Sequence, residues 1–451
     1  MPAKNEAIYR HKFRHSAFMT SKTTKIALSA LVLLTAAYLG ASSRFYTEAL
    51  ISAYFALTLL GATIIHLRIS PTWRDALLVV AGAFAFVAID FRILHFAPAI
   101  AGWLSFAGLA SLAIMGVESI WAQGESRNRH LLAFIPSVLF VISEYFADNM
   151  LTWAATIHDK VYDLYLYSFD ASLHIQIPFV LGQQFAKNAV LRNTALIAYI
   201  GLSIPIAFVY AGQVRRVGAK ALKCFAAFVI IGPVGILFYN FVPALGPAHL
   251  FGKNFPWNPL SLDQITRLLL QPVPIPGPRN AIPSLHMAWV LLAWWYSRKL
   301  SAWERAVAMF YVIFVGLATV GTGEHYFIDL VVAVPFALFI EALFAFELPP
   351  LNRKRLAGIT FGLLSTLAWL AALRFTPHVF WFSPALPWTL CIITVALGLF
   401  FESRLQDRQP ATPARPASFG ACAPKQTSPA TAFPESQNHE DATVLAEIPR
   451  L

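Results

Sequence analysis

The sequence predicts an all-α fold, a polytopic bundle of membrane-spanning helices. Hydrophobic residues make up 57% of the 451-residue chain, whereas charged residues make up only 13%. Apolar runs long enough to cross a bilayer recur along the chain, and in lipid only helices and closed barrels satisfy every backbone polar group. We expect about twelve spans. They cover residues 26–42, 46–67, 75–95, 97–117, 131–148, 195–213, 223–242, 285–298, 305–321, 327–346, 357–374 and 385–402.

The N-terminal part consists of a basic segment, residues 1–25, and a membrane block of about four spans, residues 26–130. Lysines and arginines precede the first apolar run, which favours a cytoplasmic N-terminus and a retained signal anchor. When the chain is threaded alternately from there, the later basic groups also fall on the cytoplasmic side. These groups are Arg68 and Arg74; Arg127 and Arg129; Arg215, Arg216, Lys220 and Lys223; Arg298, Lys299 and Arg305; and Arg353, Lys354 and Arg355. The net charge of +11 therefore reflects topology and attraction to anionic headgroups, and no basic stripe indicates nucleic acid binding.

The central part, residues 131–346, contains about six spans and two long connections, residues 149–194 and 243–284. The topology places both connections on the non-cytoplasmic side, and loops of this length in a compact domain are usually functional. The first is rich in aromatic residues and aspartates, so we expect it to be partly helical and to lie at the membrane interface. The second connection is rich in proline and glycine, which predicts a stiff loop without regular structure, suited to the wall of an active site.

The C-terminal part consists of two closing spans within residues 347–402 and a tail, residues 403–451. The tail is a mixture of proline, alanine, serine and threonine with few large apolar residues, which predicts a disordered cytoplasmic segment. The three cysteines have neither paired nor metal-like spacing, so we expect no disulfide framework.

Two strings in the central part place histidines at the starts of apolar helices. They are Ile282-Pro283-Ser284-Leu285-His286 and Gly323-Glu324-His325-Tyr326-Phe327-Ile328-Asp329. His325 and Asp329 are four residues apart, so on a helix they share one face and the carboxylate can accept a ring N–H of the histidine. That pairing is typical of a nucleophile with its orienting group. One interfacial histidine is usually only a polar boundary residue, but the two strings together favour a catalytic site.

The same residues suit phosphoryl transfer. Ser284 is a good N-cap, and the free N–H groups of the helix start behind it attract phosphate. His286 can donate a proton to a leaving oxygen while His325 attacks phosphorus from the opposite side. Arg279 is the expected phosphate-binding cation, seven residues before His286, and Lys253 is a weaker candidate. Neither string holds the further carboxylates or cysteines of a metal site, so we expect no metal and no cofactor.

At these residues the central part resembles the type 2 phosphatidic acid phosphatase superfamily. The second motif of that superfamily reads Pro-Ser-Gly-His, and its third reads Ser-Arg, five residues, His, three residues, Asp. Pro283, Ser284 and His286 match the second motif, with leucine in place of glycine. His325 and Asp329 match the end of the third motif.

Other residues resemble the inositol phosphorylceramide synthase branch, which transfers a phosphorylated headgroup between lipids. They are Leu285, the sequence His-Tyr-Phe-Ile-Asp at residues 325–329, and the upstream residues Tyr239, Gly246 and Pro247, which we expect in the wall of the pocket. The first motif of the superfamily is absent, and Thr319 stands where the third motif has its arginine.

The resemblance implies a membrane bundle with a phosphatidic acid phosphatase-type core of about six helices and a metal-independent reaction. His325 would attack the phosphorus of a lipid substrate, and water or an alcohol would resolve the phosphohistidine. Asp329 would orient His325, and His286 would protonate the leaving group. The implied substrates are membrane lipids, whether phospholipid, sphingolipid or polyprenyl phosphate. The implied function is inositolphosphotransferase-like.

Two alternatives stay open. A lipid phosphate or polyprenyl pyrophosphate phosphatase would use the same fold and residues, with water as the acceptor. A lipid transporter is the more remote alternative, because it predicts two related halves and the pattern of residues 282–329 has no repeat in the first half.

Overall fold

A computed structural model of the protein describes residues 22–41, 53–94 and 100–406. Within these ranges the chain is nearly all helical and has no strand, and its only β-bridge joins Val161 to Val273. The all-α class is therefore confirmed. Most of the basic N-terminal segment and almost all of the tail lie outside the described residues, so the predictions for them stay predictions.

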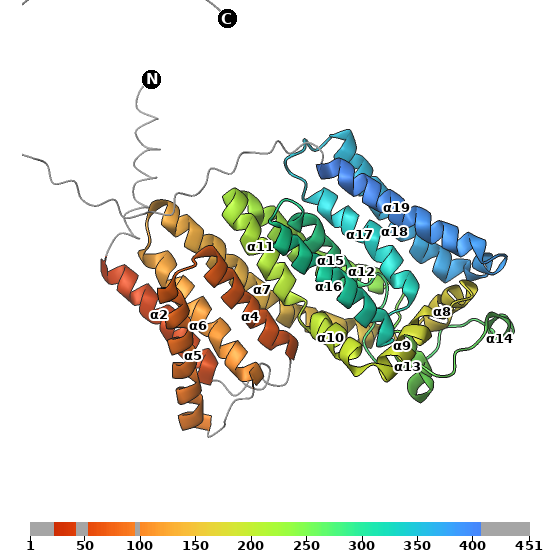
Figure 1. Ribbon diagram of the computed structural model, residues 1–451, viewed down its shortest axis with the longest axis horizontal. Coiled ribbons are helices and arrows are strands. Elements are labelled where there is room, and N and C mark those ends of the chain that lie inside the picture. The colour runs from red at the N-terminus through yellow and green to blue at the C-terminus, as the bar shows by residue number, and fades with distance from the viewer. Residues whose placement is uncertain (1–21, 42–52, 95–99, 407–451) are drawn as a thin grey trace, which may run out of the picture. The chain divides into compact units, whose positions relative to one another are not determined.

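The first five described helices form the N-terminal block, in which α6 packs against each of the others (Figure 1). They are α2 (Lys22–Ala41), α4 (Ala53–Ile69), α5 (Trp73–Leu94), α6 (Ile100–Trp121) and α7 (Gly124–Ile157). A Cβ atom on Gly108 would lie 2.3 Å from the carbonyl oxygen of Leu59, so glycine is what allows α6 to lie this close to α4. On its other side, α4 packs against the central part, and its Arg68 forms an ion pair with Glu304.

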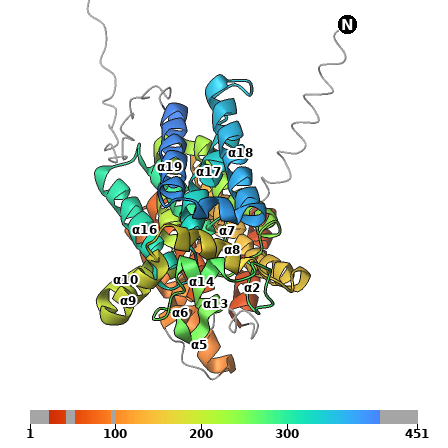
Figure 2. The same cartoon turned by 90° about the vertical axis from the view of Figure 1, so that its right-hand side faces the viewer.

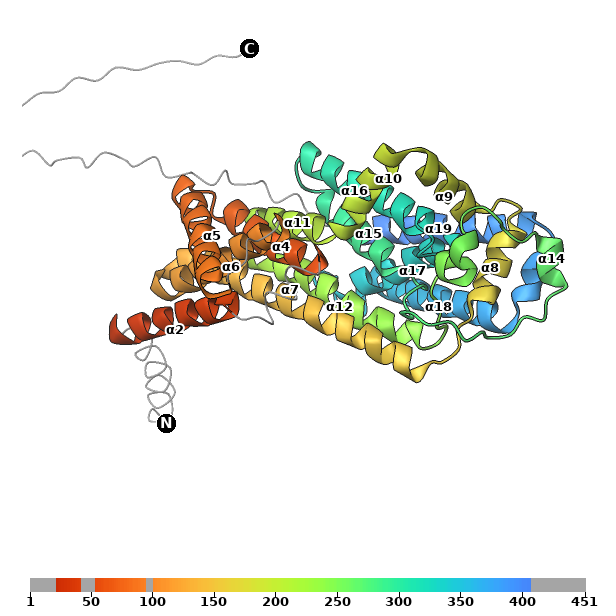
Figure 3. The same ribbon diagram turned by 90° about the horizontal axis from the view of Figure 1, so that it is seen from below.

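The central part begins inside α7, which packs along α12 (Leu222–Tyr239), as Figure 3 shows. Three short helices follow α7, namely α8 (Asp163–Ser172), α9 (Ile177–Lys187) and α10 (Ala189–Ile200), which agrees with the expected partly helical connection. Both α9 and α10 pack against α16 (Ala302–Gly321). The single span expected over residues 195–213 is wrong, because α10 ends at Ile200 and α11 (Ser203–Val217) begins anew. Gly201 caps α10, and Pro205 lies in the first turn of α11, where its missing N–H costs nothing.

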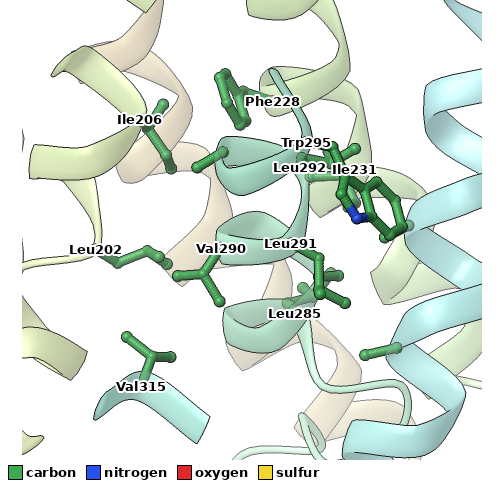
Figure 4. Close-up of a cluster of buried hydrophobic side chains, with 14 of the residues drawn as sticks. Leu202, Ile206, Phe228, Ile231, Leu285, Val290, Leu291, Leu292, Trp295 and Val315 are labelled. Atoms are coloured by element: carbon green, nitrogen blue, oxygen red, sulfur yellow. The ribbon is translucent and has the colours of Figure 1, made fainter. Parts of the chain in front are cut away.

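Helix α15 (Leu285–Ser297) lies within the hydrophobic core of the central part, beside α11, α12, α16 and α17 (Phe327–Leu343). Figure 4 shows side chains of α15 directed at neighbouring helices. Those labelled are Leu285, Val290, Leu291, Leu292 and Trp295 of α15, with Leu202, Ile206, Phe228, Ile231 and Val315 around them. This packing fixes the position of the first histidine string, residues 282–286, because that string leads into the start of α15.

Two closing helices, α18 (Arg353–Phe375) and α19 (Ala385–Gln406), cover α17. Among the described residues, seven helical stretches are long and apolar enough to cross a membrane. They are α2, α6, α7, the continuous stretch Ser203–Tyr239, α16, α18 and α19. Several other expected spans form helices of fewer than 18 residues, including α4, α15 and α17. These long apolar helices support an integral membrane protein, but the expected count of about twelve spans is not confirmed.

The second connection is not wholly irregular, contrary to expectation. It contains two short helices, α13 (Pro247–Phe251) and α14 (Leu262–Thr266), and a 3-10 turn between them, Gly252–Asn254. Proline begins α13 where the free N–H is not needed, and Ser261 caps α14 in a capping box with Gln264. Helix α8 packs against α13, α14, α17 and α18, so it joins both connections to the membrane helices (Figure 2).

Candidate active site

His325 lies in the turn between α16 and α17, and its side chain is almost fully buried. Its Nδ1 lies 2.8 Å from the carbonyl oxygen of Ala281 and 3.3 Å from Oδ2 of Asp329. Both of these atoms accept hydrogen bonds, so Nδ1 carries the hydrogen and Nε2 keeps a lone pair. Nε2 lies 3.4 Å from Oγ of Ser284. The arrangement leaves the ring with one anchored nitrogen and one nucleophilic nitrogen.

Asp329 connects the two histidine strings. Its Oδ2 also accepts a hydrogen bond from the backbone N–H of Tyr326, at 2.8 Å, which caps the start of α17. Its backbone carbonyl accepts a hydrogen bond from the N–H of Ser284, at 3.2 Å. The structure thus brings His325, Asp329 and Ser284 together, as the spacing predicts. The carbonyl of Ala281 is an additional and closer partner of His325 that the sequence did not indicate.

The start of α15 presents the second histidine. Oγ of Ser284 accepts a hydrogen bond from the N–H of Met287, so the expected N-cap forms. The ring of His286 stacks on Tyr199, with 4.0 Å between ring centres, and lies 6.4 Å from the ring centre of His325. Tyr199 comes from α10, which begins in the first connection and continues beyond it.

Two buried aspartates of α8 hold this site in place. Asp163 accepts hydrogen bonds from the N–H groups of Leu245 and Gly246 and from the hydroxyl of Tyr326, at 2.9 Å. Asp170 accepts from the N–H groups at the start of α17, at 2.8 Å from that of Phe327. Burial raises the pKa of Asp163 to about 6 and that of Asp170 to about 8.

The wall residues expected from sequence lie beside the histidine strings. A Cβ atom on Gly246 would lie 2.4 Å from the carbonyl oxygen of Glu324, immediately before His325, and φ of Gly246 is +135°. The N–H of Ala248 donates to the carbonyl of Gly323, at 2.9 Å. Pro247 begins α13 between them and is buried. Tyr239, also buried, lies next to the backbone of Leu285.

An ion pair borders the site on the side of α13. Nε2 of His249 lies 3.8 Å from Oε2 of Glu324, and about a third of each side chain is exposed. Glu324 raises the pKa of His249, and His249 lowers the pKa of Glu324. Glu324 directly precedes His325, so the pair places a partly exposed imidazole beside that residue and favours its protonated form.

The two cations expected to bind phosphate are placed differently from expectation. The guanidinium of Arg279 donates four hydrogen bonds to backbone carbonyls, those of His158, Ile275 and Gly277, and the side chain is buried. These bonds join the two connections, and none of them reaches the histidines. Lys253 lies exposed in the turn after α13. The prediction that Arg279 faces the phosphate is therefore not supported by its contacts, because its donors already serve the loop.

Sequence reasoning missed Asp163, Asp170, His249 and Glu324 as parts of the site. The two aspartates of α8 are seven residues apart, which places them on one face of a helix, but an interfacial helix shows the same pattern. Among the described residues, the one cluster with metal-ligand spacing is His66, Asp75 and Glu118 in the N-terminal block. His286 and His325 are not part of it.

Comparison with known proteins agrees with this geometry. Residues 164–343 match the family model of the PAP2 superfamily. The matched range includes both histidine strings, Asp170 and the wall residues. No curated protein and no solved structure matches the chain.

Proposed function

We propose that the protein is an integral-membrane lipid phosphotransferase that acts through a phosphohistidine and moves a phosphorylated headgroup, such as inositol phosphate, between lipids. The observation that carries this proposal is the anchored ring of His325. Two acceptors fix the hydrogen on Nδ1, so Nε2 is the free nucleophile. The match of residues 164–343 to the PAP2 superfamily supports a phosphatase or phosphotransferase class.

In the first step, Nε2 of His325 forms a bond to phosphorus while the bond from phosphorus to the leaving oxygen breaks. His286, which must be protonated for this step, gives its proton to that oxygen and becomes a neutral base. In the second step, the acceptor hydroxyl loses its proton to His286 and attacks phosphorus, and the bond to His325 breaks. The ring centres of the two histidines lie 6.4 Å apart, so both imidazoles border one small space in which the reacting phosphoryl group would be held.

Three groups stabilise the charges that develop in the proposed transition state. The positive end of the α15 dipole lies at His286 and favours negative phosphoryl oxygens. Glu324 raises the pKa of His249, which in its protonated form would add positive charge at the border of the site. Asp329 offsets the positive charge that develops on the ring of His325.

The topology that goes with this function has both termini in the cytoplasm and the active site on the non-cytoplasmic face. The distribution of arginine and lysine along the chain supports it. The lipid substrate then reaches the helix starts from the outer leaflet.

Product analysis tests the function. The full-length protein in mixed micelles is given phosphatidylinositol labelled in its phosphate, together with ceramide. A new labelled phosphodiester lipid supports the transferase. Release of free phosphate from a lipid monophosphate or pyrophosphate, with no new phosphodiester, assigns the phosphatase alternative on the same residues. No turnover of either substrate class overturns both.

The nucleophile is tested by His325→Ala, with His378→Ala as a matched control because that histidine is exposed and remote in sequence. We expect His325→Ala to abolish turnover and acid-labile phosphate on histidine while the protein stays monodisperse. Asp329→Asn should keep some activity, because it keeps the shape and one acceptor oxygen. Activity of His325→Ala near that of the control contradicts the mechanism.

A further inference from the structure

Three ligating side chains meet at one end of the N-terminal block, outside the range matched by the family model, and a fourth, His130, lies next to one of them. His66 comes from the end of α4, Asp75 from the start of α5, Glu118 from the end of α6 and His130 from the start of α7. Ligating atoms of His66, Asp75 and Glu118 all lie within 4.8 Å of one another. Nδ1 of His130 lies 3.2 Å from Oε2 of Glu118.

Burial leaves this cluster in need of a partner. His66 is completely buried, and neither of its ring nitrogens has a hydrogen-bond partner among the described residues. Oε2 of Glu118 and Nδ1 of His130 are likewise buried without a bond of acceptable geometry within that range. A buried imidazole without a partner is costly, and native structures rarely keep one without a function or a bound ion.

The spacing fits ligands around one ion. Nε2 of His66 lies 3.7 Å from Oε2 of Glu118, which is too long for a hydrogen bond. Two ligands of a tetrahedral zinc ion, each about 2.1 Å from the metal, lie about 3.4 Å apart. The separation of His66 and Glu118 is close to this value, and side-chain rotation would bring Asp75 and His130 to the same ion.

The charges fit as well. Two neutral imidazoles and two carboxylates carry two negative charges, which a divalent cation neutralises. Imidazole together with carboxylate favours first-row transition metals, zinc among them, over magnesium or calcium, which prefer oxygen ligands.

We propose that His66, Asp75, Glu118 and His130 form a structural site for a divalent transition-metal ion, with zinc as the expected occupant. The ion would tie α4, α5, α6 and α7 together. Two residues beyond His66, Arg68 pairs with Glu304 of α16, so the site lies beside the contact between this block and the catalytic part. The role is structural, since the proposed reaction uses His286 and His325, and neither belongs to the cluster.

Metal content tests the proposal on the full-length protein with any polyhistidine tag removed. After incubation with zinc and dialysis, we expect about one zinc per chain by mass spectrometry. His66→Gln and Glu118→Gln should each lose the zinc, whereas His158→Gln, a partly buried histidine bonded to Asn240, should keep it. Chelation should lower the melting temperature of the wild type but not that of His66→Gln.

Wild-type protein alone provides a second test in case the variants do not fold. Cobalt(II) added to the zinc-free protein should give the visible absorption of a nitrogen and oxygen coordinated ion, and zinc should displace it. A wild type that binds less than about one zinc per ten chains and gives no cobalt spectrum overturns the site. So does a His66→Gln variant that keeps as much zinc as the His158→Gln control.

Discussion

Gly246→Ala should damage catalysis without touching a reacting group. The added Cβ atom would lie 2.4 Å from the carbonyl oxygen and 2.5 Å from the carbonyl carbon of Glu324. It would also lie 2.6 Å from the carbonyl oxygen of Gly323, whereas ordinary contacts lie at 3.4 to 4 Å. Relieving the overlap requires the backbone before His325 to move by about 1 Å. The same movement stretches the 2.8 Å bond from the N–H of Gly246 to Asp163.

The expected loss of stability in Gly246→Ala has two sources, steric overlap and backbone strain. Overpacking typically costs about 1 to 3 kcal/mol. Placing an alanine at a φ of +135° adds strain of about 1 to 3 kcal/mol. A misplacement of about 1 Å can reduce catalysis about 100-fold, so we expect a fall of that order in kcat/KM together with a lower melting temperature.

Gly252→Ala is the matched control. Gly252 lies in the same connection and has a φ of +52°, but a Cβ atom there would meet nothing within 4 Å. It should therefore cost only backbone strain, about 1 to 2 kcal/mol, and leave kcat/KM nearly unchanged. The assay is steady-state kinetics on the lipid substrate, at a temperature at which both variants are folded. A kcat/KM for Gly246→Ala within about threefold of that for Gly252→Ala refutes the reasoning.

Three further predictions concern charge. Arg279→Lys should lower the melting temperature, because lysine cannot replace four hydrogen bonds to three carbonyls, and should reduce kcat/KM by loosening the loop. The control Lys253→Ala should change neither quantity. A loss of kcat/KM in Arg279→Lys at an unchanged melting temperature would support a phosphate-binding role for Arg279. Turnover should survive EDTA in short assays at low temperature, since the proposed chemistry uses no metal; complete loss of turnover, restored by one metal, contradicts this. The pKa of Asp163 is about 6 in the folded protein, against an ordinary value of 3.8, so the folded state binds a proton at pH values where the unfolded state has lost it. The free energy of unfolding should therefore fall by about 3 kcal/mol as the pH rises from about 4 to about 6. Melting curves of Asp163→Asn should lack this step, and equal pH dependence in both proteins would contradict the assignment.

Much of the fold could be predicted from the sequence. Apolar length and charge placement are local properties, so they indicate an all-α membrane protein and give most helix bounds to within a few residues. The pairing of His325 with Asp329 is local too, because four residues on one helix start determine it. The same locality explains the error over residues 195–213, where continuous hydrophobicity hides a break at Gly201.

Tertiary packing decided how the site is supported. Asp163 and Asp170 reach backbone groups more than 80 residues away in sequence, and the carbonyl of Ala281 fixes the hydrogen of His325 across 44 residues. Spacing along the chain carries no signal for such contacts. The role of Arg279 differs from the prediction for the same reason. A guanidinium can donate to phosphate or to carbonyl oxygens, and only the folded loop determines which acceptors lie within reach.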